Sequence, residues 1–125
     1  MSEYNQTGGQ RRIWNAALES VAGFRATWKS EAAFRPEILL SLILIPAAFW
    51  YGGTAVERIL LIGSCLVVLI VELLNSAIEA TIDRIGEDHH KLSGRAKDMG
   101  SAAVLISLLV VVLTWGLIGY ERYLS

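Results

Sequence analysis

The chain has 125 residues, of which 54% are hydrophobic and 18% are charged, and its formal net charge is −1. A soluble domain of this length normally carries a larger charged fraction, so the composition favours a single domain embedded in a membrane. It indicates no basic surface of the kind that binds nucleic acid. The single cysteine, Cys65, excludes an internal disulfide.

Residues 1–30 are predicted to form a polar tail followed by an amphipathic helix. Between Arg11 and Lys29, apolar residues recur at helical spacing. They are Trp14, Ala17, Leu18, Val21, Phe24 and Trp28. Because tryptophan favours the headgroup depth and basic side chains favour anionic lipid, we expect this helix to lie on the membrane surface. A surface helix of a soluble protein is the alternative.

Three later segments approach the length that crosses a bilayer. Residues 38–51 and 99–120 contain no charged side chain. At about 1.5 Å per residue, the second of these stretches crosses a hydrocarbon core of about 30 Å. The predicted transmembrane helices are about 32–52, 55–83 and 97–120.

Local signals mark the ends of these helices. Pro46 is expected to kink the first one. Thr54 and Glu57 have the spacing of a capping box, which predicts a helix start near Ala55. The polar stretch 84–98 is predicted to be a loop that enters the third helix. The predicted fold is therefore an all-α polytopic membrane protein whose single domain covers the whole chain.

The distribution of lysine and arginine predicts the orientation. Nine basic residues flank the first span on its N-terminal side or follow the second span: Arg11, Arg12, Arg25, Lys29, Arg35, Arg84, Lys91, Arg95 and Lys97. Only Arg58 and Arg122 lie on the other side. The positive-inside rule then places the N-terminal helix and the second loop in the cytoplasm and the C-terminus outside.

The second predicted span carries polar residues at helical spacing. Glu72, Asn75, Glu79 and Asp83 are separated by three, four and four residues, so they share one face of a helix. A carboxylate within an apolar run costs about 3 kcal/mol on insertion scales, so Glu72 needs a partner, a water-filled cavity or a raised pKa. Function is the favoured interpretation. The alternative is a neutral glutamate that links helices in an oligomer.

Near the start of the third span, Lys97 and Asp98 extend this polar region. Lysine can bind phosphate oxygens and carboxylates can hold Mg²⁺, so these are residue types that phosphoryl transfer uses. A solvated cluster of ion pairs is the alternative. The spacing of His89 and His90 does not indicate a zinc site. The chain contains neither a P-loop nor the signatures of protein kinases.

Three motifs in this order resemble the prokaryotic diacylglycerol kinases, which are small integral membrane lipid kinases. They are EAAFR at 31–35, VELLNSAIEATIDR at 71–84 and LSGRAKDMGSA at 92–102. The resemblance covers nearly the whole chain. It implies a homotrimer in the bacterial inner membrane with a periplasmic C-terminus. Each chain would contribute one surface helix and three transmembrane helices, and neighbouring chains would share active sites.

The resemblance also implies a reaction, in which ATP phosphorylates the primary hydroxyl of diacylglycerol and phosphatidate is formed. Glu72 would be the general base, and Asn75 would orient the reacting groups. Glu31 and Glu79 would bind the Mg²⁺ that accompanies ATP. A buried carboxylate is a stronger base near neutral pH than a solvated one, which agrees with this role for Glu72.

Further positions are assigned by their match to the family. The ATP-binding set is Arg12, Glu19, Glu31, Glu79, Asp88, His89, His90, Lys97 and Asp98. The lipid-binding set is Arg12, Arg25, Trp28, Arg35, Glu37, Glu72 and Ser101. The sequence departs from the familiar pattern at Glu19 and His89, where an aromatic residue is expected, and at Lys91, where an acid is expected.

Two other functions compete with this interpretation. An undecaprenol kinase would use the same motifs and mechanism on a long isoprenoid alcohol. A small oligomeric channel or proton-coupled transporter would use the stripe from Glu72 to Glu79 as an ion path. A pore has no need of Lys97, Asp98 and Glu31, whereas a Mg-nucleotide site does.

Overall fold

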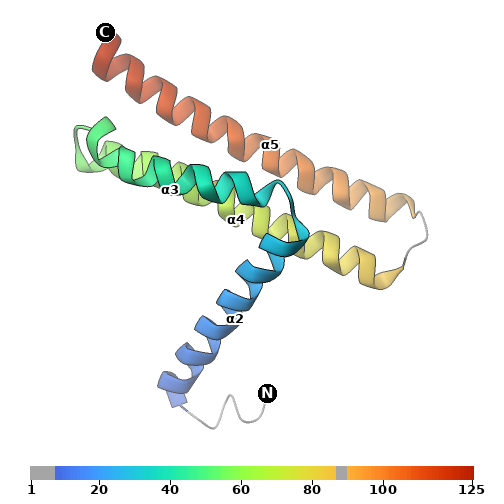
Figure 1. Cartoon of the computed structure of the whole chain (residues 1–125). Helices are drawn as coiled ribbons and strands as arrows, with labels where there is room; N and C mark the ends of the chain where they lie inside the picture. Colours follow the sequence, from blue (N-terminus) through green and yellow to red (C-terminus); the bar gives the residue numbers. More distant parts are fainter. Residues whose placement is uncertain (1–7, 87–89) are drawn as a thin grey trace.

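The computed structural model describes residues 8–86 and 90–125. These residues form four α-helices and no strand, and the last helix ends in a short π-helical segment, η1 (Figure 1). The elements are α2 (Gly8–Ser30), α3 (Phe34–Tyr51), α4 (Ala55–Ile85), α5 (Lys91–Gly119) and η1 (Tyr120–Leu124). The all-α prediction is confirmed, and α3, α4 and α5 are long and apolar enough to cross a membrane.

The central helix is α4, which packs against both α3 and α5. The three long helices run side by side, whereas α2 projects away from them and meets α3 and α4 at its C-terminal end (Figure 1). The helix predicted at 11–29 is therefore present, and its apolar side chains Trp14, Leu18 and Val21 are exposed. Its location at the membrane surface stays a prediction.

The capping box predicted at the start of the second span is present. The Glu57 backbone N–H donates to Thr54 Oγ1 at 3.1 Å, and Glu57 Oε1 accepts from the backbone N–H of Thr54 at 3.3 Å. The same oxygen also accepts from the Gly53 N–H at 2.6 Å. Such a cap contributes about 1 kcal/mol and fixes the helix start at Ala55, as predicted.

The prediction of a loop over residues 84–98 was wrong in its extent. Helix α4 continues to Ile85, and α5 already begins at Lys91. The charged residues had suggested a loop, but a helix that leaves the hydrocarbon core can carry solvated charges for further turns. His90 caps this helix, because its Nδ1 accepts a hydrogen bond from the Leu92 N–H at 3.0 Å. Pro46 lies inside α3, where it was expected, and the kink stays a prediction.

The corner between α2 and α3 is held by Arg35 and Phe34. Arg35 donates to the backbone carbonyls of Trp28 at 2.7 Å and Lys29 at 3.1 Å, which are among the unpaired carbonyls at the end of α2. Phe34 is buried, and its ring centroid lies 6.4 Å from that of Phe24. These contacts fix where α2 leaves the bundle and position the turn that carries Glu31.

An aromatic cluster joins α3 to α5 at the opposite end of the bundle. The Tyr51 hydroxyl donates to the Trp115 carbonyl at 2.9 Å, and the two rings lie 5.0 Å apart. The Tyr123 hydroxyl donates to the Tyr51 carbonyl, also at 2.9 Å. Gly119 permits this packing, because a Cβ at this position would collide with the Tyr51 hydroxyl.

We therefore expect Gly119→Ala to lower the free energy of unfolding by about 1–3 kcal/mol, the usual effect of overpacking. Tyr51→Phe removes one hydrogen bond and should cost about 1 kcal/mol. In the double variant the hydroxyl that meets the new methyl is gone, so the loss should be smaller than the sum of the two single losses. Reversible unfolding in detergent micelles measures these changes.

Gly116→Ala is the matched control, because a Cβ there meets nothing within 4 Å in this chain. It should leave stability unchanged or raise it slightly, since alanine favours helix more than glycine. Equal effects of the substitutions at Gly116 and Gly119 would contradict this account of the cluster.

Candidate active site

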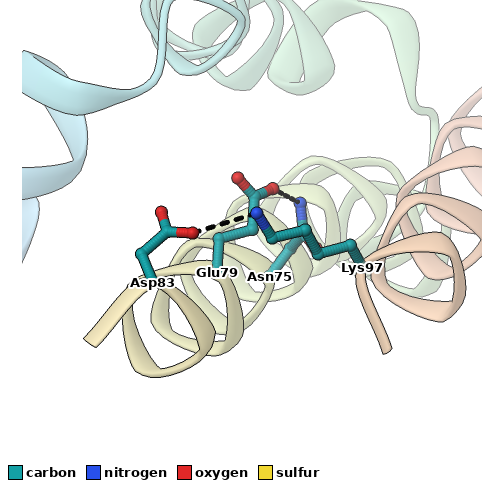
Figure 2. A network of polar contacts seen from close by, with 4 residues as sticks. All are labelled: Asn75, Glu79, Asp83 and Lys97. Atoms are coloured by element: carbon teal, nitrogen blue, oxygen red, sulfur yellow. Dashed lines mark hydrogen bonds and ion pairs between the residues drawn. The ribbon is translucent and has the colours of Figure 1, made fainter. Parts of the chain in front are cut away.

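The polar residues of α4 lie together as the sequence predicts. Figure 2 shows Asn75, Glu79 and Asp83 along one side of the helix, with Lys97 reaching toward them from α5. Asn75 Nδ2 donates to Glu79 Oε1 at 3.0 Å, and Lys97 Nζ donates to Asp83 Oδ1 at 2.9 Å. The two helices therefore bring an amide, two carboxylates and an ammonium group into one row.

Glu72 begins this row in the interior of the bundle, and only 5% of its surface is exposed. Its carboxyl group lies near the Glu37 carboxyl on α3. Asn75 follows one turn later on the same face of α4. The row thus runs from a buried carboxyl group to the exposed pair of Lys97 and Asp83.

The position of Asn75 depends on a close approach between α4 and α5. Gly100 of α5 is buried, and a Cβ there would collide with Asn75 Oδ1. That oxygen is itself buried and has no hydrogen-bond partner within the described residues. Asn75 therefore keeps one acceptor available while its amide nitrogen is bound to Glu79.

Glu31 reaches the same row from the turn between α2 and α3. Its backbone N–H donates to the Thr27 carbonyl at 2.9 Å, and its own carbonyl accepts from the Phe34 N–H at 3.2 Å. Its carboxyl group lies near that of Glu79. Partial burial, followed by the proximity of Glu79, raises the pKa of Glu31 above its ordinary value, and the charge of Glu72 adds to this shift.

Two facing carboxyl groups fit a magnesium site that is completed by a ligand. Within residues 8–86 and 90–125, no group of three or more His, Cys, Asp or Glu side chains is arranged to hold a metal ion. Mg²⁺ is commonly bound by one or two carboxylates together with substrate phosphates and water. The donor set of Glu31 and Glu79 has this character, because both are oxygen ligands and a cation between them would relieve their repulsion.

Lys97 and Asp83 form an ion pair that water can reach, with 45% and 68% of their side-chain surfaces exposed. Exposed pairs of this kind contribute about 0–1 kcal/mol, so a ligand can displace either partner at little cost. Asp98, the neighbour of Lys97, is also exposed. An ammonium group has three N–H donors, so Lys97 can donate to a negatively charged group from water in addition to Asp83.

The remaining residues of the predicted ATP-binding set are less closely grouped. Arg12 and Glu19 are exposed and belong to α2, the helix that projects away from the bundle (Figure 1). His90 is exposed and caps α5. Asp88 and His89 lie outside the described residues.

The predicted lipid-binding set is spread over several places. Arg25 and Trp28 line a groove between α2 and α3, and Glu72 and Glu37 meet inside the bundle. The groove is otherwise apolar, with Val21, Phe24, Phe34 and Ile38 as its further lining. Arg35 is bound to the carbonyls at the end of α2, and Ser101 is exposed on α5. Arg35 thus has a structural contact that the sequence pattern did not indicate.

Comparison with known proteins identifies the family. Residues 18–119 match the sequence profile of the family described as prokaryotic diacylglycerol kinase. The chain is 52% identical over 119 residues to the diacylglycerol kinase of Escherichia coli strain K12, covering 95% of this chain and 98% of the relative. The chain belongs to the prokaryotic diacylglycerol kinase family.

Two further relatives show how widely this similarity extends. Identity to the Pseudomonas aeruginosa diacylglycerol kinase is 51% over 117 residues, covering 94% of this chain and 95% of that one. Identity to the diacylglycerol kinase of Helicobacter pylori strain 26695 is 40% over 108 residues, covering 86% of this chain and 84% of that one. The family resemblance drawn from the three motifs is confirmed. Membership in a family of diacylglycerol kinases favours the enzyme hypothesis over a channel or transporter.

The contact between Gly100 and Asn75 was not predicted from the sequence. The available signal was a glycine inside an apolar helical pattern, which often marks a close approach of two elements. In this member of the diacylglycerol kinase family, the glycine makes room for the amide that binds Glu79.

We expect Gly100→Ala to lower kcat for lipid phosphorylation by about 10²-fold, because the new methyl displaces the Asn75 side chain and a displacement of about 1 Å can have an effect of this size. The protein should still fold, since the atom that must move belongs to a side chain. Initial rates of lipid phosphorylation with Mg-ATP, together with unfolding curves, measure both effects.

Gly116→Ala, on the same helix, provides the control and should keep the wild-type rate. If Gly100→Ala were as active as this control, the position of Asn75 would not matter for turnover.

Proposed function

We propose that this bacterial membrane protein transfers the γ-phosphoryl group of ATP to the primary hydroxyl of diacylglycerol and forms phosphatidate at the cytoplasmic membrane surface. The observation that carries the proposal is the row on α4, which joins a buried carboxyl group at Glu72 to the exposed Lys97–Asp83 pair. A lipid hydroxyl reaches the reaction from the membrane, and ATP reaches it from water. The row spans these two environments.

In this reaction Glu72 accepts the proton of the lipid hydroxyl as its oxygen attacks the γ-phosphorus. General base catalysis of this kind contributes about 10²–10⁴-fold to a rate. Asn75 Oδ1, which has no partner among the described residues, is available to orient the attacking group. Lys97 donates hydrogen bonds from its ammonium group to phosphate oxygens. This role suits the reaction, because catalysis of phosphoryl transfer depends mainly on positioning and on charge stabilisation.

Glu31 and Glu79 are the residues that would hold Mg²⁺ with the nucleotide. The bound ion would neutralise charge on the phosphate oxygens. The support for this assignment is the proximity of the two carboxyl groups and the raised pKa of Glu31, both of which indicate a place that favours a cation. Asn75 holds Glu79 in position through its amide.

The lipid would enter beside α2. The groove lined by Arg25 and Trp28 presents an apolar floor to acyl chains and a guanidinium group to the headgroup region. The proposed lipid-binding set also includes Glu37, which lies near the proposed base Glu72, and Ser101 on α5. The orientation that follows from the basic residues places α2, with the loop between α4 and α5, in the cytoplasm and the C-terminus in the periplasm.

We further propose a homotrimer with active sites shared between chains. Arg12 and Glu19 lie on α2, which projects away from the other three helices of its chain (Figure 1). For these two residues to contact nucleotide, α2 would have to reach the active site of a neighbouring chain. Helix α5 also exposes a long apolar surface that another chain or lipid must cover. It includes Leu105, Ile106, Leu109, Val112, Leu113 and Leu117.

The direct test measures phosphorylated lipid in mixed micelles with Mg-ATP and either diacylglycerol or undecaprenol. Wild-type protein should form phosphatidate. Glu72→Gln should lower kcat by at least about 10²-fold while nucleotide binding persists, because the substitution keeps the size of the side chain and removes the base. Glu121→Gln, exposed on η1 at the far end of the bundle, should retain the wild-type rate.

The two lipid arms separate the remaining hypotheses. A higher kcat/KM with undecaprenol than with diacylglycerol would replace the proposed substrate and leave the proposed mechanism unchanged. If the folded protein phosphorylates neither lipid, the kinase function is contradicted and the channel becomes the favoured hypothesis.

A second prediction concerns the metal ion. Glu31→Gln and Glu79→Gln should each raise the Mg²⁺ concentration needed for half-maximal activity, by about 10-fold or more, because each removes one anionic oxygen ligand. Glutamine at position 79 can still accept the Asn75 hydrogen bond, so the fold should persist. Activity titrated with Mg²⁺ at saturating ATP measures the shift. An unchanged requirement in both variants would exclude these carboxylates as ligands.

A further inference from the structure

Asp83 ends the row on α4, and the proposed reaction gives this residue no role. Its Oδ1 accepts a hydrogen bond from Lys97 Nζ at 2.9 Å (Figure 2). Because 68% of the Asp83 side-chain surface is exposed, water alone would satisfy this carboxylate. The contact contributes little to stability, as is usual for an exposed ion pair. Its main consequence is therefore for the direction of the lysine side chain.

The alignment of α4 with α5 places the Lys97 backbone well before Asp83 along the row. The two helices run side by side in opposite directions (Figure 1). Gly100 of α5 lies against Asn75, where a Cβ would collide with Asn75 Oδ1. Lys97 precedes Gly100 by three residues, which is about 4.5 Å along the helix axis. Glu79 follows Asn75 by four residues, or about 6 Å in the same direction. The Lys97 backbone is thus roughly level with Glu79, and Asp83 lies a further turn toward the exposed end.

The Lys97 side chain therefore extends along the row, past Glu79, to reach Asp83. Side chains on a helix lean toward its N-terminus, and the N-terminal end of α5 lies at the exposed end of the row, so helix geometry allows this direction. A lysine ammonium group is a point charge on a flexible stem. Without Asp83, it would have the Glu79 carboxylate beside its own backbone as a partner. Glu79 is one of the two proposed magnesium ligands, so that pairing would compete with the metal ion.

We propose that Asp83 is a positioning residue, which holds the Lys97 ammonium group beyond Glu79 at the end of the row that nucleotide reaches from water. This inference rests on the proposed function, in which Lys97 donates to the phosphate oxygens of ATP. The bond to Asp83 uses one of the three N–H donors of the ammonium group, so two stay available for phosphate. Asp83 thereby reduces the conformational freedom that Lys97 must lose when nucleotide binds.

The charge of Asp83 separates this role from a purely electrostatic effect. A carboxylate close to a triphosphate repels it, so removal of the carboxylate should by itself strengthen nucleotide binding. If Asp83 positions Lys97, its removal should instead weaken binding, because the lysine is no longer held in one direction. The two effects have opposite signs.

Asp83→Leu and Asp83→Glu are a matched pair for this test. Leucine has the branched shape of aspartate and cannot accept a hydrogen bond, whereas glutamate keeps a carboxylate that can still bind Lys97. We expect Asp83→Leu to raise the Kd for β,γ-imido-ATP, a non-hydrolysable analogue added with Mg²⁺, by about fivefold, the size of effect that an exposed pair can have. Asp83→Glu should bind it within about twofold of wild type. Titration calorimetry of the detergent-solubilised protein measures both values.

The effect should disappear when the lysine is absent. In Lys97→Met, the further change Asp83→Leu should leave the Kd unchanged or lower it, because only the repulsion is then removed. A Kd that rises by the same factor with and without Lys97 would overturn the proposal, as would unchanged or tighter binding by Asp83→Leu alone. Glu121→Gln, which alters an exposed acid on η1 at the far end of the bundle, is the control and should bind as wild type does.

Initial rates of lipid phosphorylation test whether the same residue matters for turnover. Asp83→Leu should raise the KM for Mg-ATP by about fivefold and leave the KM for diacylglycerol unchanged, and Asp83→Glu should restore the KM for Mg-ATP. A parallel rise in both KM values would indicate a general loss of structure and overturn the positioning role. If the wild-type protein phosphorylates neither lipid but binds the analogue with the expected dependence on Asp83 and Lys97, the positioning role stands and the proposed function fails.

Discussion

The structure depends on the placement of the Glu72 carboxyl group inside a membrane-spanning bundle. Such a group costs about 3 kcal/mol on insertion scales, and the surrounding helices must compensate for that cost. Glu37 of α3 lies near this carboxyl group, and Asn75 follows it one turn later on α4.

Glycine makes the required helix contacts possible at both ends of α5. At Gly100 the backbone approaches closely enough for Asn75 to fit against it, and at Gly119 it accommodates the Tyr51 hydroxyl. A bundle embedded in lipid gains little from hydrophobic burial, so close packing and interhelical hydrogen bonds carry more of its stability. The same contacts set the register in which Lys97 meets Asp83 across the two helices.

The arrangement divides the proposed chemistry along one helix. In the proposed function Glu72 would meet the lipid hydroxyl, and the exposed end of the row would meet the nucleotide. Glu31 is carried into this row by a short turn, which Arg35 and Phe34 stabilise from the far side of the corner. The turn therefore links the helix that projects from the bundle to the proposed metal ligands.

The sequence by itself determined the helices, their spanning character, the cap at Thr54, the shared face from Glu72 to Asp83 and the family. These follow from periodicity, hydropathy and local motifs, which act over a few residues. It did not reveal that residues 91–98 are helical, because solvated charges occur equally in loops and at helix ends. Tertiary structure alone decided that Gly100 admits Asn75. It also placed Glu31 near Glu79 and Glu37 near Glu72, pairs that the family resemblance had only assigned to the same ligand sets. Each of these contacts depends on how two segments of the chain are aligned against each other. A residue pattern within one helix does not predict that alignment.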